Sequence, residues 1–389
     1  MTRAAVWEQE LSAAERAALH PGLPQELNRR PDVLVVGGGV IGLATAVACR
    51  IAGLGSVVVI ERAERLASAA SGGNGGAIAP DMHALTDSAE FVAFGRASLA
   101  LYRRLDAQWN GAIGLRTTRW LQMFPAAGGP PALPVGPQFE LLDGAGIRVL
   151  EPDLALSEGC TALLVGGQGA VNPQRLAAAL AGRAGIVASG VEATGVRVRG
   201  DRITAVHTSA GDFQPGALVV ATGLIPPPWS QPVRQRWVKG HLLATAPGPW
   251  QLNSVVSSDQ GGVSPLPAGG ILSGGTLDHG DTSPEPRPEI VAGLVAGLHR
   301  LLPATRHAPL THRWCCFRPV IDGRHPVIDQ LPGTTNGWLS AGHFTTGVLM
   351  AAATGQALVS WILSNTRPPE TATFDLPTHK PIASSVWAM

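Results

Sequence analysis

Residues 32–43 read DVLVVGGGVIGL, and this stretch decides the fold. The run 32–36 is apolar and β-branched, which predicts a buried strand. Three glycines follow it, and residues 43–52 have helical composition. A second apolar run, 56–60, ends at Glu61. We therefore predict a strand, a glycine turn, a helix and a strand, which form a βαβ unit of an α/β fold with a parallel sheet.

The glycines have the spacing G-x-G-x-x-G. With 48 glycines in 389 residues, about 0.7 matches arise by chance. The context makes this match specific, because it follows a strand, opens a helix and ends 19 residues before Glu61. Such a turn brings a dinucleotide pyrophosphate to a helix N-terminus, while the acid binds a ribose. A tight turn without a ligand is the alternative. The predicted cofactor contacts here are Gly37, Gly39, Val40, Ile41, Gly42, Glu61 and Arg62.

Composition and charge limit the other function classes. Residues 33–49 are uncharged and imitate a short membrane span. Three glycines in mid-helix would cost about 3 kcal/mol relative to alanine, which favours strand, turn and helix over a span. The net charge of +1 argues against a nucleic-acid partner. The N-terminus has no basic and then apolar leader, so we expect no transmembrane segment and a cytoplasmic location. The four cysteines form no disulfide framework and no zinc motif, and we predict no metal.

Three further segments are rich in small residues and would let the backbone approach a ligand closely. They read SGGNGGAIAP at 71–80, LVVATG at 218–223 and AGHFTTGVLMAAATG at 341–355. The last predicts a turn before a helix over 347–363, whose first N–H groups carry partial positive charge. The predicted contacts in these segments are Ser71, Gly72, Gly73, Asn74, Gly75, Gly76, Ala77, Ala221, Thr222, Gly223, Gly342, Phe344, Thr345, Thr346, Gly347 and Val348.

Arg318 stands alone in an apolar strand. A buried guanidinium needs an anionic partner, which is either an internal carboxylate or a substrate carboxylate. We favour the substrate, and predict Arg318 and His343 as the catalytic residues. For His343, as for His241, a purely structural hydrogen-bonding role is an equal alternative.

Taken in order, these motifs resemble the FAD-dependent D-amino acid oxidase superfamily, in its glycine oxidase and D-amino acid dehydrogenase branch. The resemblance covers residues 32–365 and includes VVVIER at 57–62 and FRPVIDGRHPVID at 317–329. It implies a Rossmann-like FAD-binding domain and a second, α+β substrate domain on a mixed or antiparallel sheet. It implies non-covalent FAD and oxidation of a C–N bond by hydride transfer to flavin N5, with hydrolysis of the imine product. It also implies that Val191 contacts the adenine through its backbone.

Two positions depart from the glycine oxidase pattern. Thr345 and Thr346 stand where those enzymes have an arginine, and residues 260–263 read QGGV where a tyrosine is usual. We therefore expect a substrate that is bulkier, less polar or more carrier-like than free glycine. Related sarcosine-type oxidases attach flavin to a cysteine in this region. A covalent link through Cys315 or Cys316 is thus the alternative to two buried thiols.

We predict a discontinuous domain organisation. Residues 8–19 are expected to form a helix within the extension, with Ser12 and Glu15 in capping-box spacing. The predicted segments are an N-terminal extension (1–31), an FAD-binding domain (32–86, 159–232 and 318–370), a substrate domain (87–158 and 233–317) and a C-terminal tail (371–389).

Several alternatives stay open for the reaction and its partners. The electron acceptor is O₂ in an oxidase, or a partner protein or quinone in a dehydrogenase. A flavin-binding protein without amine oxidation is a third alternative, and a nicotinamide dehydrogenase would leave the C-terminal motif unexplained. The expected substrate is a small amine or amino acid, and a homo-oligomer is an open alternative.

Overall fold

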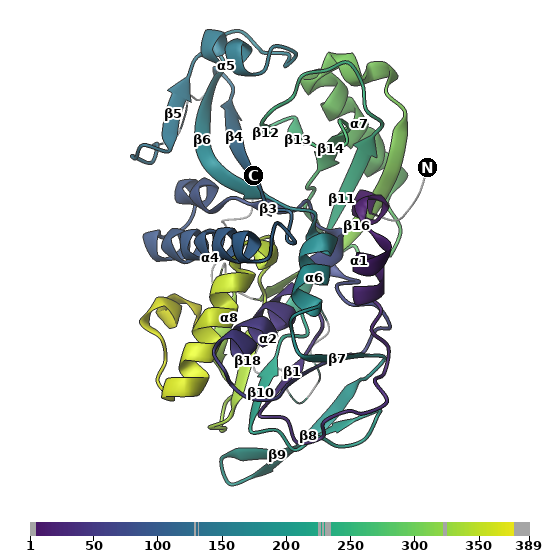
Figure 1. Cartoon of the computed structure of the whole chain (residues 1–389). Coiled ribbons are helices and arrows are strands. Elements are labelled where there is room, and N and C mark those ends of the chain that lie inside the picture. The colour runs from purple at the N-terminus through teal and green to yellow at the C-terminus, as the bar shows by residue number, and fades with distance from the viewer. Residues whose placement is uncertain are drawn as a thin grey trace.

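The computed structural model describes residues 5–127, 130, 132–224, 227, 229, 235–321 and 325–376. The predicted domain boundary between residues 232 and 233, and most of the predicted tail at 371–389, lie outside the described residues. The chain forms two main sheets, with the smaller one in the lower half of Figure 1 and the larger one in the upper half.

The smaller sheet has six strands in the order β17-β18-β10-β1-β2-β7. All neighbours are parallel except β17, which runs antiparallel to β18. The strands are β1 (Val33–Val36), β2 (Val57–Glu61), β7 (Ile186–Ser189), β10 (Ala217–Val220), β17 (Val327–Gln330) and β18 (Gly337–Ala341). Every residue of β1 is buried, as expected for a parallel strand covered on both faces.

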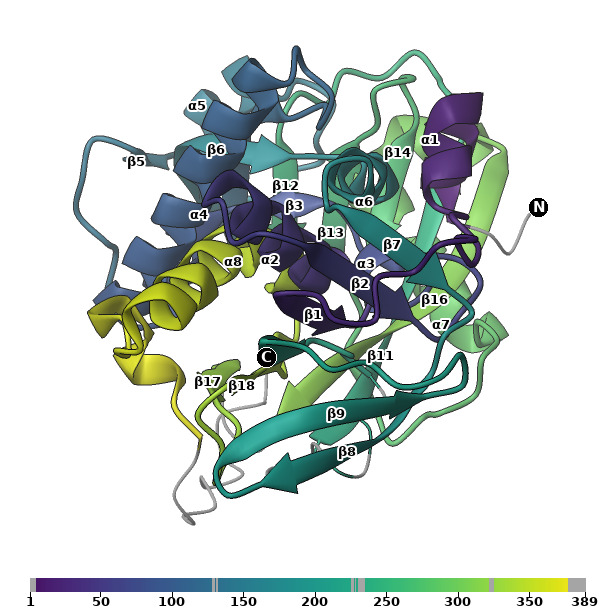
Figure 2. The same cartoon turned by 60° about the horizontal axis from the view of Figure 1, so that its bottom comes forward.

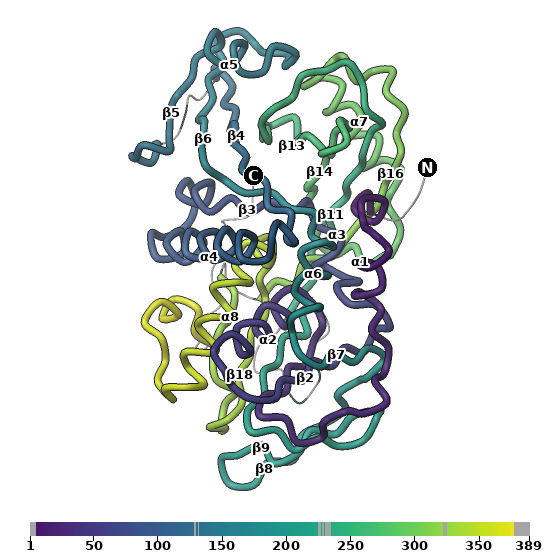
Figure 3. Tube along the Cα trace, in the orientation of Figure 1, coloured from purple at the N-terminus to yellow at the C-terminus, as the bar shows by residue number. Residues whose placement is uncertain are grey.

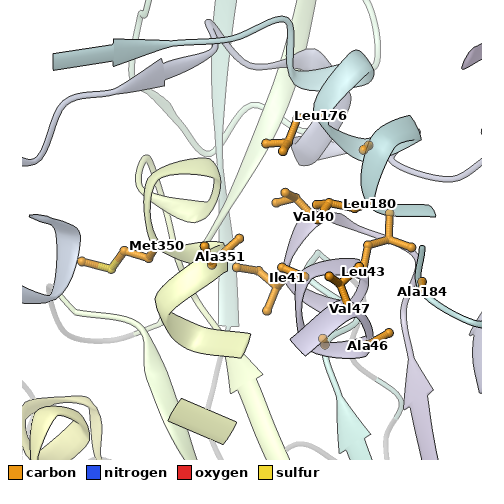
Figure 4. Close-up of a cluster of buried hydrophobic side chains, with 14 of the residues drawn as sticks. Val40, Ile41, Leu43, Ala46, Val47, Leu176, Leu180, Ala184, Met350 and Ala351 are labelled. Carbon is orange, nitrogen blue, oxygen red and sulfur yellow. The ribbon is translucent and has the colours of Figure 1, made fainter. Parts of the chain in front are cut away.

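The helix α2 (Val40–Ile51) lies between α6 (Pro173–Ala181) and α8 (Gly347–Ser364). Figure 4 shows Leu176 and Leu180 of α6 on one side of α2, and Met350 of α8 on the other. The helix α8 is long and apolar enough to cross a membrane, but 67% of its residues are buried within the fold. This burial is typical of a core helix, because α8 packs against both α2 and α4 (Ala89–Gln108).

The larger sheet is mixed and mostly antiparallel, with β4 and β12 as a parallel pair. Its strands are β3 (Ala77–Ile78), β4 (Arg116–Phe124), β5 (Phe139–Leu142), β6 (Thr161–Ala170), β11 (Gln235–Thr245), β12 (Val255–Ser258), β13 (Gly261–Pro265), β14 (Ile271–Gly274), β15 (Asp278–His279) and β16 (Leu310–Ile321). The predicted fold class is confirmed: a Rossmann-like parallel sheet accompanies a second, mixed sheet. The exact domain division stays a prediction, since β6 falls within the segment 159–232 but pairs with β4 and β5.

The remaining elements lie around the two sheets. Figure 2 shows the β8–β9 hairpin at the near edge of the molecule. These elements are α3 (Ala70–Gly73), η2 (Pro80–Leu85), α5 (Gly144–Leu150), β8 (Ala193–Arg199), β9 (Arg202–Thr208), α7 (Pro288–Leu301), η4 (Pro303–His307) and η5 (Pro369–Phe374).

The N-terminal extension forms two short helices, η1 (Val6–Glu10) and α1 (Ala13–Ala18). The prediction of one helix over 8–19 is therefore wrong. Its own capping box explains the break, because the Ser12 hydroxyl accepts from the N–H of Glu15 and the Glu15 carboxylate accepts from the N–H of Ser12. A residue in that role starts a helix, so the preceding residues lie outside it.

Candidate functional site

The carboxyl ends of four parallel strands meet at one edge of the smaller sheet. They lead into Gly37 after β1, Glu61 at the end of β2, Ala221 after β10 and Gly342 after β18. The chain order reverses beside β1, because β2 lies on one side of it and β10 on the other. Ligands of open α/β sheets bind at such a switch point.

The turn after β1 depends on glycine at two positions. Gly37 has φ +118°, and a side chain there would collide with the carbonyl oxygen of Ala221. A side chain at Gly42 would collide with the carbonyl oxygen of Gly37, so only glycine lets the first turn of α2 pack this closely on the turn after β1. Gly39 is the N-cap of α2 and makes no side-chain cap bond. The first backbone N–H groups of α2 therefore favour an anion at this end of the helix. One of them, the N–H of Val40, donates to the Ser71 hydroxyl at 3.0 Å.

Glu61 closes one side of this turn. Its carboxylate accepts from the N–H of Gly38 at 2.7 Å and from the N–H of Ala63 at 2.9 Å. Each oxygen keeps further acceptor capacity for the ribose hydroxyls that the sequence predicts. Val191 lies beside it, and its N–H donates to the Glu61 carbonyl at 2.8 Å.

A cavity of about 750 Å³ begins at this edge and continues beneath the larger sheet. Its volume lies in the range of about 300–1,000 Å³ that is typical of ligand and cofactor pockets. Twenty predicted residues line it: Gly39, Val40, Ile41, Glu61, Arg62, Ser71, Asn74, Gly75, Gly76, Ala77, Ala221, Thr222, Gly223, Arg318, Gly342, His343, Phe344, Thr345, Gly347 and Val348. The other predicted residues, Gly37, Gly42, Gly72, Gly73, Val191 and Thr346, are not part of the lining.

The residues outside the lining support its wall. Thr346 donates its N–H and its hydroxyl to the carbonyl of His343, each at 2.8 Å, and so shapes the turn before α8. A side chain at Gly73 would lie 2.7 Å from Cβ of Cys316, so this glycine lets the loop 70–77 pack closely on β16. Thr346 therefore acts through hydrogen bonds and Gly73 through close packing, both from behind the wall.

His343 is buried beside the first turn of α8. Burial lowers its pKa to about 3, so the imidazole is neutral at pH 7. Within the described residues, its Nε2 atom and the Ser340 hydroxyl have no hydrogen-bond partner, although both side chains belong to the cavity wall. Buried polar atoms without a hydrogen-bond partner are unfavourable, and polar groups of a bound cofactor or substrate would supply the missing hydrogen bonds. This part of the cavity thus fits a polar ring system beside a helix N-terminus.

Arg318 lies on β16 and faces the cavity. Among the described residues it makes one hydrogen bond, from Nη1 to the carbonyl of Thr276 at 2.8 Å. Burial lowers the pKa of the guanidinium, and the negative charge of Asp278 partly offsets this effect. A side chain at Gly240 would collide with the guanidinium, so this glycine lets Arg318 lie against β11. The arginine is therefore held in place with donors left over for an anion.

The opposite face of the same strands carries a polar network. The His241 Nε2 atom accepts from the N–H of Arg287 at 3.0 Å, so its Nδ1 carries the proton that Asp278 accepts at 2.9 Å. Asp278 also accepts from the Thr276 hydroxyl. Nearby, the buried Lys239 ammonium binds Asp281 at 2.9 Å. His241 thus has a structural role on β11, the strand that pairs with the Arg318 strand β16.

The sequence did not predict most of the residues that line the cavity on the side of the larger sheet. Its wall there includes Trp120, Leu242, Val256, Leu272, Thr276 and His83. Met82 and His83 come within three residues of the end of the predicted segment 71–80. Their nearness to that segment is the one sequence signal that could have identified them as wall residues. The His83 Nδ1 atom lies 3.0 Å from Asp87, which fixes the ring in the wall. Nothing local marks the others, because they come from separate strands.

The two neighbouring cysteines differ in position. Cys316 lines the cavity, whereas Cys315 is outside the lining and donates to the carbonyl of Pro284 at 3.2 Å. Burial raises the pKa of both thiols, that of Cys315 to about 11. Both are therefore protonated at neutral pH, which disfavours attack on a cofactor. Within the residues described, no cluster of three or more His, Cys, Asp or Glu side chains fits a metal ion.

A glycine turn at a switch point and a cavity beyond it are typical of dinucleotide-binding oxidoreductases. Residues 32–361 match the family described as FAD dependent oxidoreductase (DAO), and the chain belongs to this family. Its cofactor is FAD, as the sequence predicted.

Two curated relatives and one solved structure show the extent of the similarity. The bifunctional protein ThiO/ThiG of Trichormus variabilis is 26% identical over 368 residues, 87% of this chain and 53% of that protein. The chain thus spans about half the length of the first relatives it matches. The glycine oxidase of Bacillus licheniformis is 26% identical over 362 residues, 87% of this chain and 95% of that protein. The L-proline dehydrogenase from P. horikoshii has the same fold, with a TM-score of 0.79 at 19% identity over 90% of this chain and 97% of its own.

Proposed function

We propose that the protein oxidises the C–N bond of an amino acid whose side chain is apolar and larger than that of glycine. Arg318 carries this proposal. It is a cation in the cavity wall, in the half-cavity on the side of the larger sheet. Among the described residues no carboxylate binds its guanidinium, whose hydrogen bond to the Thr276 carbonyl leaves further donors free. A substrate carboxylate would neutralise this guanidinium by accepting two hydrogen bonds from it.

The walls of this half-cavity support the expected substrate class. Leu242, Val256 and Leu272 are apolar, and Gly261 and Gly262 stand where a bulky side chain would reduce the space. Thr345 lies in the wall where an arginine is usual in glycine oxidases. Among the described residues of the lining, Glu61 is the one acidic side chain, and it lies at the nucleotide end. A cationic side chain of the substrate would therefore find no counter-ion among the described residues of this half-cavity.

The chain's residues would act mainly by placement. FAD, when bound, supplies the hydride acceptor. Arg318 binds the carboxylate and so orients the hydrogen on the neighbouring carbon. The apolar walls exclude water and favour the uncharged form of the amine by desolvation. The N-terminus of α8 and the neutral His343 provide hydrogen-bond donors and partial positive charge at the cavity wall.

Anaerobic mixing of the FAD-loaded protein with a panel of amino acids tests the proposal. We expect apolar amino acids such as leucine, phenylalanine or proline to bleach the flavin absorbance, and lysine or arginine to leave it unchanged. Bleaching by glycine alone, or by amines without a carboxylate, would contradict the proposed substrate class. Protein that is photoreduced but bleached by no amine would favour the alternative of a lost activity.

The electron acceptor is part of the same proposal. Reoxidation of the reduced protein by air with stoichiometric peroxide would define an oxidase. Slow reaction with air and fast reaction with a soluble quinone would define a dehydrogenase.

A further inference from the structure

The loop 70–77 has two faces. Ser71, Asn74 and the residues 75–77 face the cofactor cavity. The opposite face meets the N-terminal residues 5–19, called here the N-terminal strap. In Figures 1 and 3 the strap runs beside α6 and close to α3, the start of this loop.

Two tryptophans hold consecutive carbonyls of the loop from behind. The indole N–H of Trp7 donates to the carbonyl of Asn74 at 2.8 Å. The indole N–H of Trp314 donates to the carbonyl of Gly73, also at 2.8 Å. Both rings are almost fully buried, with 2% and 3% of their surface exposed. These bonds fix the direction of two peptide groups in a segment where glycine provides no side-chain anchor.

The loop also has internal order that depends on the orientation of Asn74. The Asn74 amide donates to the carbonyl of Ser71 at 2.6 Å, and its side-chain oxygen accepts from the N–H of Gly76 at 2.7 Å. A rotation of the Asn74 peptide would disturb these bonds and the cavity face together. Trp7 is therefore well placed to control the shape of the cofactor wall.

The strap itself is firmly attached. Asn172 donates to the carbonyl of Trp7 at 2.9 Å, and Arg175 binds the carboxylate of Glu15 at 2.9 Å. The Trp7 ring packs in one cluster with Leu242, Leu272 and Cys316, whose side chains also belong to the cavity wall. Trp7 thus supports the cavity both through a hydrogen bond and through the apolar wall. It lies outside residues 32–361, the part that matches the family.

We propose that Trp7 is a positioning residue for the cofactor, and that the N-terminal strap is a built-in clamp that raises the affinity for FAD. The clamp acts through the backbone of Asn74 and needs no contact between Trp7 and FAD. This inference requires FAD binding and is independent of the substrate.

The first test compares Trp7→Phe with Trp250→Phe. Trp250 makes the same kind of bond, from its indole N–H to the carbonyl of Gly269, but it is outside the cavity lining. Trp7→Phe keeps an aromatic ring, although a smaller one, and removes the N–H donor, and Trp250→Phe makes the same change elsewhere. We expect a dissociation constant for FAD about three- to tenfold higher, in line with one lost hydrogen bond, and an altered visible circular dichroism of the bound flavin. Trp250→Phe should match the wild type in both. Equal FAD affinity and equal flavin spectra for the two folded variants would overturn the proposal.

The second test uses the unchanged chain, and so holds even if the variant folds poorly. If the strap strengthens FAD binding, FAD must strengthen the strap by the same factor. Amide hydrogen exchange of residues 5–11 should therefore be slower in the FAD-loaded protein than in the apoprotein by about three- to tenfold. Exchange at the same rate in both forms would show that the strap is not coupled to the cofactor.

Discussion

The two halves of the cavity are built by different means. The nucleotide half consists of backbone: strand ends, a glycine turn and the N-terminus of α2, with Glu61 as its main charged side chain. The substrate half consists of side chains from separate strands, and Arg318 is oriented by Thr276, 42 residues earlier in the chain. The first half therefore tolerates few changes of shape, whereas the second tolerates changes of shape and depends on charge. Four experiments would break or sharpen this contrast.

The largest effect is expected for Gly37→Ala. The positive φ makes an alanine unfavourable by about 1–3 kcal/mol, and overpacking against Ala221 adds about 1–3 kcal/mol. We expect protein purified without FAD, as shown by its visible absorbance. Gly53→Ala is the matched control, since Gly53 has φ +74° but no atom within 4 Å of the added carbon. Yellow Gly37→Ala protein with normal affinity would refute a backbone-built nucleotide half.

Arg318→Met tests the charge of the substrate half. Loss of one partner of a buried, hydrogen-bonded charge pair is worth about 2–5 kcal/mol, so kcat/KM should fall about 30-fold or more with the best substrate. FAD content should stay normal, because Arg318 lies on β16 of the larger sheet. A variant that loses FAD but keeps kcat/KM per bound flavin would reverse the assignment of the two halves.

His343 should make the fold sensitive to acid. Its pKa is about 3 in the folded chain, below the ordinary value of 6.5, so between these values the unfolded chain binds the extra proton. Stability should therefore fall as the pH falls from 6.5 towards 3, by up to about 1.4 kcal/mol per pH unit from this residue. Urea unfolding at pH 6.5 and 5.0 measures this, and His343→Gln should flatten the dependence. An equal slope in both proteins would mean that His343 is protonated in the fold.

The smallest effect is expected for Asp278→Asn. The change keeps the shape but removes the charge that binds His241 and the Thr276 hydroxyl, which together hold the carbonyl that orients Arg318. KM should rise about fivefold, equivalent to about 1 kcal/mol, with kcat and FAD content unchanged. Asp212→Asn is the control, because Asp212 pairs with His207 at 2.9 Å on the exposed β8–β9 hairpin. A change of kcat without a change of KM would argue against a positioning network.

The sequence predicted the nucleotide half well, because its requirements are local. A strand, glycines at fixed spacing and an acid at the next strand end are all visible within 30 residues, and the structure brings Gly39 and Glu61 to one cavity. Glycine is informative there because the backbone has no room for a side chain. Arg318 was visible for a related reason, as a lone charge in an apolar run.

The other contacts were not visible because their partners are distant in the chain. Thr276, Trp120 and Leu272 reach the cavity only through the pairing of strands in the larger sheet, whose register is set by long-range contacts. Residues 8–19 of the strap were predicted as one unbroken helix, and the role of Trp7 behind Asn74 could not be read from the residues around it. The side-chain half of a site therefore needs the fold, whereas the backbone half needs only the motif.

The order of strands in the smaller sheet has a consequence for biosynthesis. β18 pairs with β10, although 116 residues separate Val220 from Gly337 in the chain, and the turn at Gly342 and the start of α8 follow it. A nascent chain halted before this point lacks one wall of the pocket. We therefore expect flavin to be captured only after residues near 350 have left the ribosome. Until then the surface of α2 that α8 covers stays unpaired, and chaperones can bind it.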